Sequence, residues 1–350
     1  GVWRVWGRLS KTNKLMTALG GRLSRRIHLN LLAIIQIKYI WIEVFFMPRL
    51  PRQKSDHAIF HVMCRSITEV DLFKDDDDKV KYLSLMRKYQ KLYQFKVYGY
   101  CLMDNHAHFI IDVNGADIST IMHSVNFSYA MYFNKRHGRH GHLFQDRFKS
   151  KIINDERYLF ALSAYIHNNP LNVTGYESCP EKYTFSSLSI YLGLKKDPFE
   201  LVDTGFVMSL FGNNTESARR NYIQLVYRYN TEKYKNELEF KNEGTEYRSG
   251  RTILVRDISP DSITMFIAKK FNISDIEIRI KNSKENMDAK SMLVVLMRCL
   301  CNYKCTDISR IIGNITESSI SMLSSRGIGL ISKRKEFKDI IREFISEYAA

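Results

Sequence analysis

The stretch Lys96–Val113 reads KVYGYCLMDNHAHFIIDV, and it decides the fold. Two runs rich in β-branched and aromatic residues, Lys96–Met103 and His106–Val113, flank the dipeptide Asp104-Asn105. Runs of this kind joined by two turn residues are typical of a β-hairpin. The sequence therefore predicts two neighbouring antiparallel strands at this point of the chain.

The second of these strands carries two histidines, His106 and His108. Residues two apart on a strand point to the same face of the sheet, and two strand steps place their Cβ atoms roughly 7 Å apart. Two imidazoles at this spacing can bind one divalent ion. An isolated His-x-His pair is more often found on the solvated face of a strand, so the metal interpretation depends on a partner elsewhere in the sequence.

Further strand and helix patterns surround the hairpin. Acidic residues in the first turn and apolar residues every three or four positions predict helices, and β-rich alternation predicts a strand. The expected elements are a strand at 58–63, a helix at 75–93, the hairpin, a helix at 117–137 and a helix at 154–170 that Pro170 ends. This alternation is typical of an α+β domain with an antiparallel sheet.

The helix that ends at Pro170 carries Tyr165 and Asn169. Residues four apart share a helix face, so a phenol and an amide oxygen lie together. Beside the two histidines, these groups would supply a nucleophile and a third metal ligand. A free phenol has a pKa near 10 and is a poor nucleophile at neutral pH, but a bound cation could polarise a phosphodiester for it. Spacing alone leaves Tyr158, two turns earlier, as an alternative.

The segment 141–151, GHLFQDRFKSK, alternates cations with aromatic rings. Such a mixture suits single-stranded DNA, because cations can follow the phosphates while the rings stack on bases. Alternatively, Phe144 and Phe148 pack the loop onto the core, and only Arg147, Lys149 and Lys151 are solvated. The two interpretations are compatible with each other.

The composition favours a polyanionic partner. The 350 residues include 53 Lys and Arg against 37 Asp and Glu, a formal charge of +16. This excess fits nucleic acid first and an anionic membrane surface second. The 6 cysteines have no disulfide-framework spacing, so we expect a cytoplasmic protein. No apolar run reaches the roughly eighteen residues of a membrane span, so no membrane partner is expected.

Residues 1–46 differ from the rest, since they contain all 3 tryptophans and only one acidic residue, Glu43. We expect a dispensable or non-native extension before Met47. The alternative is a signal or anchor, because residues 31–46 are largely apolar, although Lys38 and Glu43 interrupt them.

The C-terminal third is expected to be helical, after a polar linker near 230–250. Short amphipathic pieces are predicted at 262–271, 274–280, 288–303, 306–312 and 316–325. Thr306 and Thr316 are good N-caps, and Gly313-Asn314 separates the last two pieces in the outline of a helix-turn-helix. A helical bundle is the plainer alternative. Cys299, Cys301 and Cys305 are expected to be buried thiols rather than zinc ligands.

Several motifs that follow one another in order resemble a known family over residues 47–230. They are Met47-Pro48-Arg49, Phe60-His61-Val62 with Arg65, the stretch 100–108, Tyr132-Phe133-Asn134, the segments 141–145 and 147–150, the stretch 165–170, Ser186-Ser187 and the stretch 209–212. These motifs are similar to those of the REP-associated tyrosine transposases. That family belongs to the HUH-type single-tyrosine, insertion sequence 200-like transposases.

The resemblance implies a ferredoxin-like, RRM-like domain whose central strands carry the two histidines. The HUH motif of the family falls on His106-Ala107-His108, its catalytic tyrosine on Tyr165 and its third metal ligand on Asn169. The implied cofactor is Mg²⁺ or Mn²⁺, and imidazole ligands favour Mn²⁺. One departure is Asp104, where relatives usually carry proline, and an aspartate can still begin a tight turn.

The resemblance further implies a single-stranded DNA endonuclease and strand transferase that forms a 5′-phosphotyrosine link at hairpin ends. Residues 47–195 would be the HUH catalytic domain, 196–250 a helical extension and linker, and 251–350 a DnaA-like helix-turn-helix domain. The expected DNA contacts are Arg65, Asn105, Phe144, Gln145, Arg147, Lys149, Lys151 and, beside a recognition helix at 316–325, Arg326.

Two points stay open at this stage. The alternative function is a non-catalytic, sequence-specific DNA-binding regulator derived from a transposase. Replication initiators and relaxases share the histidine pair, but they usually place the tyrosine differently and carry a further large domain. The oligomeric state is either a monomer or a homodimer.

Overall fold

The computed structural model describes residues 55–212, 214–228, 253–279, 286–313 and 315–348. These residues lie within one compact unit that spans 53–350. The expected N-terminal extension, the motif Met47-Pro48-Arg49 and the linker near 230–250 lie outside the described residues.

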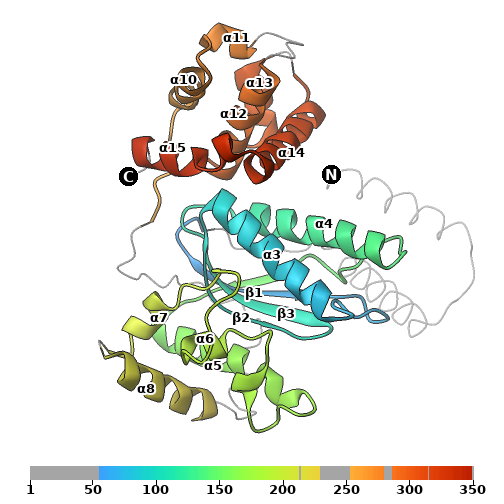
Figure 1. The fold of residues 1–350 in the computed structure, drawn as a ribbon, viewed down its shortest axis with the longest axis vertical. Coiled ribbons are helices and arrows are strands. Elements are labelled where there is room, and N and C mark those ends of the chain that lie inside the picture. Colours follow the sequence, from blue (N-terminus) through green and yellow to red (C-terminus); the bar gives the residue numbers. More distant parts are fainter. Residues whose placement is uncertain (1–54, 213, 229–252, 280–285, 314, 349–350) are drawn as a thin grey trace, which may run out of the picture. The chain divides into compact units, whose positions relative to one another are not determined.

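A four-stranded antiparallel sheet forms the centre of the first part (Figure 1). Its strands are β1 (Ile59–Arg65), β2 (Lys96–Leu102), β3 (His106–Asp112) and β4 (Lys149–Ile152), in the spatial order β2-β3-β1-β4. Helix α3 (Asp76–Tyr93) connects β1 to β2, and α4 (Ile118–Arg136) connects β3 to β4. This strand order and connectivity are those of the expected ferredoxin-like fold. The predicted α+β class is therefore confirmed.

Local sequence signals account for where α3 and α4 begin. The Asp75 side chain caps α3 by accepting a hydrogen bond from the amide of Asp78, and acidic residues fill the first turn. Asp117 caps α4 by accepting one from the amide of Ser119. An aspartate at the N-cap satisfies an amide that has no partner within the helix. Both helix starts agree with the sequence prediction.

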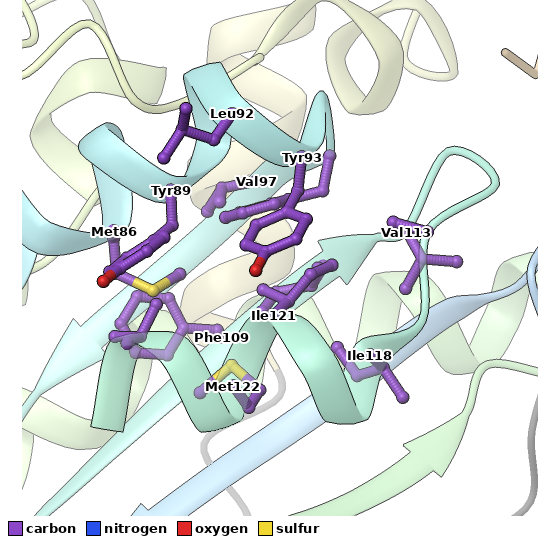
Figure 2. Close-up of a cluster of buried hydrophobic side chains, with 14 of the residues drawn as sticks. Met86, Tyr89, Leu92, Tyr93, Val97, Phe109, Val113, Ile118, Ile121 and Met122 are labelled. Atoms are coloured by element: carbon purple, nitrogen blue, oxygen red, sulfur yellow. The ribbon is translucent and has the colours of Figure 1, made fainter. Parts of the chain in front are cut away.

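Helices α3 and α4 cover one face of the sheet and enclose its main core (Figure 2). The side chains that meet there include Met86, Tyr89 and Tyr93 from α3, Ile118, Ile121 and Met122 from α4, and Phe109 from β3. Each fully buried apolar side chain stabilises the fold by about 1.5–3 kcal/mol. This layer holds β3, the strand with the histidine pair, in a fixed position.

The opposite face of the sheet is covered by α5 (Glu156–Asn168), which contacts β2 and β3 and packs against α8 (Thr215–Arg228). His167 of α5 is buried, with Nε2 2.7 Å from Ser187 Oγ and Nδ1 2.6 Å from the Tyr222 hydroxyl. The Ser187 hydroxyl also accepts a hydrogen bond from the amide of Tyr100 in β2. This network fastens α5 to the sheet and to α8. The short elements η1 (Asn169–Asn172), η2 (Pro180–Lys182), α6 (Leu188–Tyr191) and α7 (Gly205–Ser209) lie between them in the chain.

The C-terminal part is helical, as expected. Its elements are α10 (Pro260–Phe271), α11 (Asp275–Arg279), α12 (Met287–Cys299), α13 (Cys305–Ile312), α14 (Glu317–Lys333), η3 (Lys335–Phe337) and α15 (Ile340–Tyr348). Thr316 caps α14 as predicted, by accepting a hydrogen bond from the amide of Ser319. The predicted cap at Thr306 is wrong, because α13 already begins at Cys305.

The predicted end of α14 at Ser325 is also wrong, since the helix continues to Lys333. Gly327 lies where α14 crosses α12, and a Cβ atom there would be 2.5 Å from the carbonyl oxygen of Ser291. The close crossing explains why a glycine is accommodated inside the helix. Tertiary packing here outweighs the low helix propensity of glycine.

Arg256 connects the C-terminal helical part of the chain to the α+β part. Its buried guanidinium donates hydrogen bonds to the backbone carbonyls of Tyr93 and Asn114 on one side and of Cys299 and Leu300 on the other. Burial lowers the pKa of Arg256 to about 10, so the group stays charged at neutral pH.

Two smaller expectations concern cysteines and membranes. All 6 cysteines are free, and Cys299 and Cys301 are buried as expected. The expectation that Cys305 is buried is wrong, because this residue, at the start of α13, is partly exposed. Across the residues that the structure describes, no helix has the length and apolar character needed to cross a membrane.

Candidate active site

His106 and His108 lie together on the face of the sheet that α5 covers. Their ring centroids are 5.0 Å apart at an angle of 86°. His108 is buried, whereas His106 is partly exposed. Burial lowers the pKa of both rings, and for His106 a hydrogen bond to Asn169 partly opposes this effect. Both imidazoles are therefore neutral at physiological pH, which is the form that binds a metal.

A third histidine, His61 of β1, was not identified from the sequence as a site residue. Its Nε2 lies 3.0 Å from Nδ1 of His108, and the two rings stack at 5.3 Å. Burial lowers the pKa of His61 to about 3, so this ring is neutral too. A proton on His108 Nδ1 can be donated to His61, which leaves the Nε2 lone pair of His108 for a ligand. The alternating pattern of β1 indicates which face of the strand carries His61. It places this residue beside His108 only once the pairing of β1 with β3 is known.

Asn105 orients the other histidine. Its Oδ1 lies 2.6 Å from Nδ1 of His106. An amide oxygen can only accept, so Nδ1 of His106 carries the proton and Nε2 keeps its lone pair. Asn105 was expected to contact DNA, and the structure places its side chain on His106.

Tyr165 and Asn169 approach the histidines from α5 and η1. The Tyr165 ring meets His108 edge to face, with centroids 5.6 Å apart, and it is partly exposed. Nδ2 of Asn169 donates to the carbonyl oxygen of Tyr165 over 2.9 Å, and the same side chain lies beside His106. Since the amide nitrogen serves the helix backbone, the amide oxygen is the atom available on the histidine side.

The alternative tyrosine, Tyr158, has a different environment. Its ring lies 4.4 Å from Nζ of Lys151, a cation–π contact. The structure thus brings Tyr165, rather than Tyr158, against the ring of His108.

Comparisons with known proteins give one family match and one structural match. Residues 54–169, which include all four of the residues His106, His108, Tyr165 and Asn169, match the family described as "Transposase IS200 like". This part of the chain is similar to the IS200-like transposases. A solved structure titled "Structure of the REP associates tyrosine transposase bound to a REP hairpin" is similar at 15% identity and a TM-score of 0.37, over 45% of this chain and 93% of that chain. The search of curated proteins finds no match.

The turn before the histidine pair is held in place by Asp104. Asp104 accepts a hydrogen bond from Nζ of Lys79 over 2.8 Å, and Lys79 is buried against Tyr183. The carbonyl oxygen of Asp104 also accepts from the amide of Phe73, and that of Asn105 from the amide of Ser66. An ion pair and backbone hydrogen bonds thus hold this turn in place.

The loop 141–148 runs beside the end of β1. Phe144 bridges to Ser66, and the amide of Gln145 donates to the carbonyl oxygen of Arg65. Arg65 is itself paired across the sheet with His106. The loop therefore lies at the same end of the sheet as the histidine pair.

The loop side chains divide into exposed and packed ones. Gln145, Arg147 and Lys149 are exposed, whereas Phe144 is partly buried and packs on the core. Phe148 is buried. This supports the packing interpretation for the rings, while Phe144 keeps part of its surface accessible.

The expectation that Lys151 is solvated is wrong, because this residue is only 6% exposed. No strand was predicted at 149–152, but these residues form β4. This strand pairs with β1 and places Lys151 opposite His61. Its ammonium then lies under the Tyr158 ring instead of in water. The sequence of β4, KSKI, is polar and gives no strand signal, so its pairing with β1 could not be predicted without the tertiary structure.

Arg326, expected beside a recognition helix, lies within α14. Its Nη2 is 2.6 Å from Oδ1 of Asp288 in α12. Half of its side chain is exposed, so it combines an internal ion pair with access to solvent.

The donor set fits a divalent cation. His106 and His108 each have a neutral ring with Nδ1 engaged by a neighbour, and Asn169 has its amide nitrogen engaged by the backbone. Within the described part of the chain, no three His, Cys, Asp or Glu side chains cluster as metal ligands. A site here therefore depends on the amide oxygen as its third protein ligand. Nor do the described cysteines form part of any such cluster.

Proposed function

We propose that this protein is a transposase-type endonuclease and strand transferase that acts on single-stranded DNA, with Tyr165 as the nucleophile. The observation that carries the proposal is the contact of the Tyr165 ring with His108, while the Asn169 side chain lies beside His106. A nucleophile, two neutral imidazoles and an amide meet at one place. The family that residues 54–169 match supports DNA as the substrate.

In the first step, Oη of Tyr165 attacks the phosphorus of a phosphodiester. A bond from Oη to phosphorus forms and the bond from phosphorus to the 3′ oxygen breaks, while the phenolic proton passes to solvent and the leaving oxygen takes one up. The products are a free 3′-hydroxyl and a 5′-phosphotyrosine link. In the second step, a 3′-hydroxyl of another strand attacks the same phosphorus and releases Tyr165. Each step exchanges one phosphoester for another, so no nucleotide hydrolysis is needed.

His106, His108 and Asn169 would hold the metal, Mg²⁺ or Mn²⁺. When bound, this ion polarises the scissile phosphate and stabilises charge on the leaving 3′ oxygen. The protein's own contribution is orientation: the Asn105 oxygen sets the protonated nitrogen of His106, and His61 contacts Nδ1 of His108. Side chains that hydrogen-bond the ligand rings in this way tune metal affinity.

The exposed residues around the site suit a single strand. Arg65, Arg147 and Lys149 supply cations beside the histidines, and the accessible part of Phe144 can stack on a base. Gln145 adds an amide at the same edge. We infer that hairpin ends present the strand here and that the helix pair α13–α14 forms a helix-turn-helix for duplex contacts.

The test is covalent capture. Hairpin oligonucleotides with single-stranded flanks are incubated with Mn²⁺ and the wild type, Tyr165→Phe or the matched control Tyr158→Phe, and run on a denaturing gel. Wild type and Tyr158→Phe should form a protein–DNA adduct, and Tyr165→Phe should form none. An adduct with Tyr165→Phe would refute the assignment.

A further inference from the structure

A basic groove of about 490 Å³ lies between the C-terminal half of α3 and the segment from the end of α14 to α15. Its cationic lining residues on α3 are Lys88 and Lys91, and those on the C-terminal segment include Lys333, Lys335 and Lys338. No acidic residue lines it among the residues described. The groove therefore concentrates positive charge from two regions that are far apart in the sequence.

Most of this charge has no internal counterpart. Within the described residues, no carboxylate forms an ion pair with Lys88, Lys91, Lys333, Lys335 or Lys338. The groove's two arginines do have partners: Arg334 pairs with Asp288 and Glu336, and Arg342 with Asp339. Five ammonium groups without a carboxylate partner among the described residues repel one another around one hollow, and an anion bound there would relieve that repulsion.

The rest of the lining indicates which part of a nucleic acid would bind. The other lining residues are Leu92, Gln94, Ile331, Ser332 and Ile341, so the described lining contains no aromatic ring. Sites for single strands combine cations with rings that stack on bases, whereas contacts to a duplex are made largely to phosphates. A groove of cations without rings is suited to the backbone of a duplex.

The groove lies away from the candidate active site. Lys79, near the start of α3, contacts the turn before His106, and Lys91 follows it by twelve residues. At about 1.5 Å per residue this separates the two sites by roughly 18 Å along the helix axis. Helix α3 also covers the sheet face opposite to α5, which carries Tyr165. DNA that reaches both places must extend beyond the cleaved strand.

Hydrogen bonds join α3, one wall of the groove, to the end of α12, which packs against α14 of the other wall. Arg256 donates to the carbonyl oxygen of Tyr93 at the end of α3 and to that of Leu300 after α12. Its burial makes this connection part of the folded core. The groove is therefore a fixed feature of the compact unit.

We propose that this groove is a second DNA site, which binds the phosphates of duplex DNA next to the cleaved single strand. The inference rests on the proposed function only in taking DNA as the substrate. A separation of roughly 18 Å corresponds to about five base pairs at 3.4 Å each. The groove should therefore add affinity only when the duplex stem is longer than about five base pairs.

The experiment measures equilibrium binding of fluorescent hairpins by anisotropy across a salt series, in full-length protein carrying Tyr165→Phe so that no cleavage occurs. The groove variant is Lys333→Gln, Lys335→Gln and Lys338→Gln. The control variant, Lys182→Gln, Lys196→Gln and Lys269→Gln, removes the same charge from exposed positions outside the groove lining. A further variant carries arginine at the three groove positions. Circular dichroism checks that each variant is folded.

For a stem of twelve base pairs, the groove variant should lower the slope of log K against log salt by about 2 to 3, since each lost phosphate contact accounts for about 0.9. The control and the arginine variant should keep the wild-type slope. Equal slopes for groove variant and control, or the same loss with a four-base-pair stem, would overturn the proposal. A loss seen with a duplex RNA stem but not with DNA would overturn it as well.

The proposed function and the groove proposal are refuted by different results. An absent covalent adduct in the wild type would refute the proposed function, even if the groove variant loses its salt slope. An unchanged slope would refute the groove, even if Tyr165 forms the adduct.

Discussion

Nε2 of His61 lies 3.0 Å from Nδ1 of His108, and burial lowers the pKa of both rings. Two neutral imidazoles at this distance share one proton, with one ring as donor and the other as acceptor. The contact therefore determines which nitrogen of His108 faces the Tyr165 side of the sheet. Such outer partners orient the metal-ligating histidines of many proteins.

Replacing His61 tests this relationship. His61→Ala should weaken Mn²⁺ binding by roughly 10- to 100-fold, the usual effect of losing an outer-shell partner. His61→Gln should lose less, because an amide oxygen can accept the His108 proton. Calorimetric titration with Mn²⁺ measures both, and His123→Ala, at an exposed position of α4, is the control. Unchanged affinity in His61→Ala would show that His108 needs no such partner.

The ion pair between Lys79 and Asp104 should stabilise the turn before His106. Asp104→Ala leaves the buried ammonium with only the Tyr183 hydroxyl, and should lower the free energy of unfolding by about 1–2 kcal/mol. The double variant with Lys79→Met should be less destabilised than the sum of the single ones, because the charge is removed with its partner. Urea unfolding of the four proteins gives the coupling, and strict additivity would contradict the pairing.

The crossing of α12 and α14 makes opposite predictions for two neighbouring glycines. Gly327→Ala would put a methyl group 2.5 Å from the Ser291 carbonyl oxygen, which should cost about 1–3 kcal/mol of stability. Gly329→Ala meets nothing within 4 Å and should be neutral or stabilising by about 0.4–1 kcal/mol. Thermal unfolding of both variants tests the pair. Equal effects would mean that the helices do not approach this closely.

His167 should make stability depend on pH. Burial lowers the pKa of His167 to about 3, so the ring stays neutral in the folded state at a pH where the unfolded state, with a usual pKa of about 6.5, is protonated. Between these values the unfolded state binds more protons, and stability falls as the pH falls, by about 1.4 kcal/mol per pH unit for each such group. His61 adds to the same window. His167→Gln should flatten urea-derived stability between pH 6 and pH 4 relative to wild type, and an unaltered slope would contradict the buried neutral state.

Local signals were enough to predict the framework of the fold. The aspartates that cap α3 and α4 and the turn at Asp104-Asn105 all act within a few residues of the structure they start. The polar strand β4 could not be predicted, because its pairing with β1 depends on the whole sheet. The end of α14 was missed for a related reason, since a glycine such as Gly327 is tolerated only through contact with α12.

The same distinction applies to the site. Spacing predicted that His106 and His108 share a face and that Tyr165 and Asn169 share another, and the structure brings the two pairs together. The position of His61 required the order of the strands. The burial of Lys151 and the basic groove depend on segments distant in sequence, so no local pattern indicated them.

The most direct test of the central claim is to locate the covalent link. Wild-type protein is incubated with Mn²⁺ and a hairpin oligonucleotide, digested with nuclease and protease, and the nucleotide-bearing peptide is sequenced by mass spectrometry. The account predicts a 5′-phosphate ester on Tyr165. A modified residue elsewhere, such as Tyr158, or an adduct that forms equally well after His106 and His108 are both replaced by alanine, would contradict it.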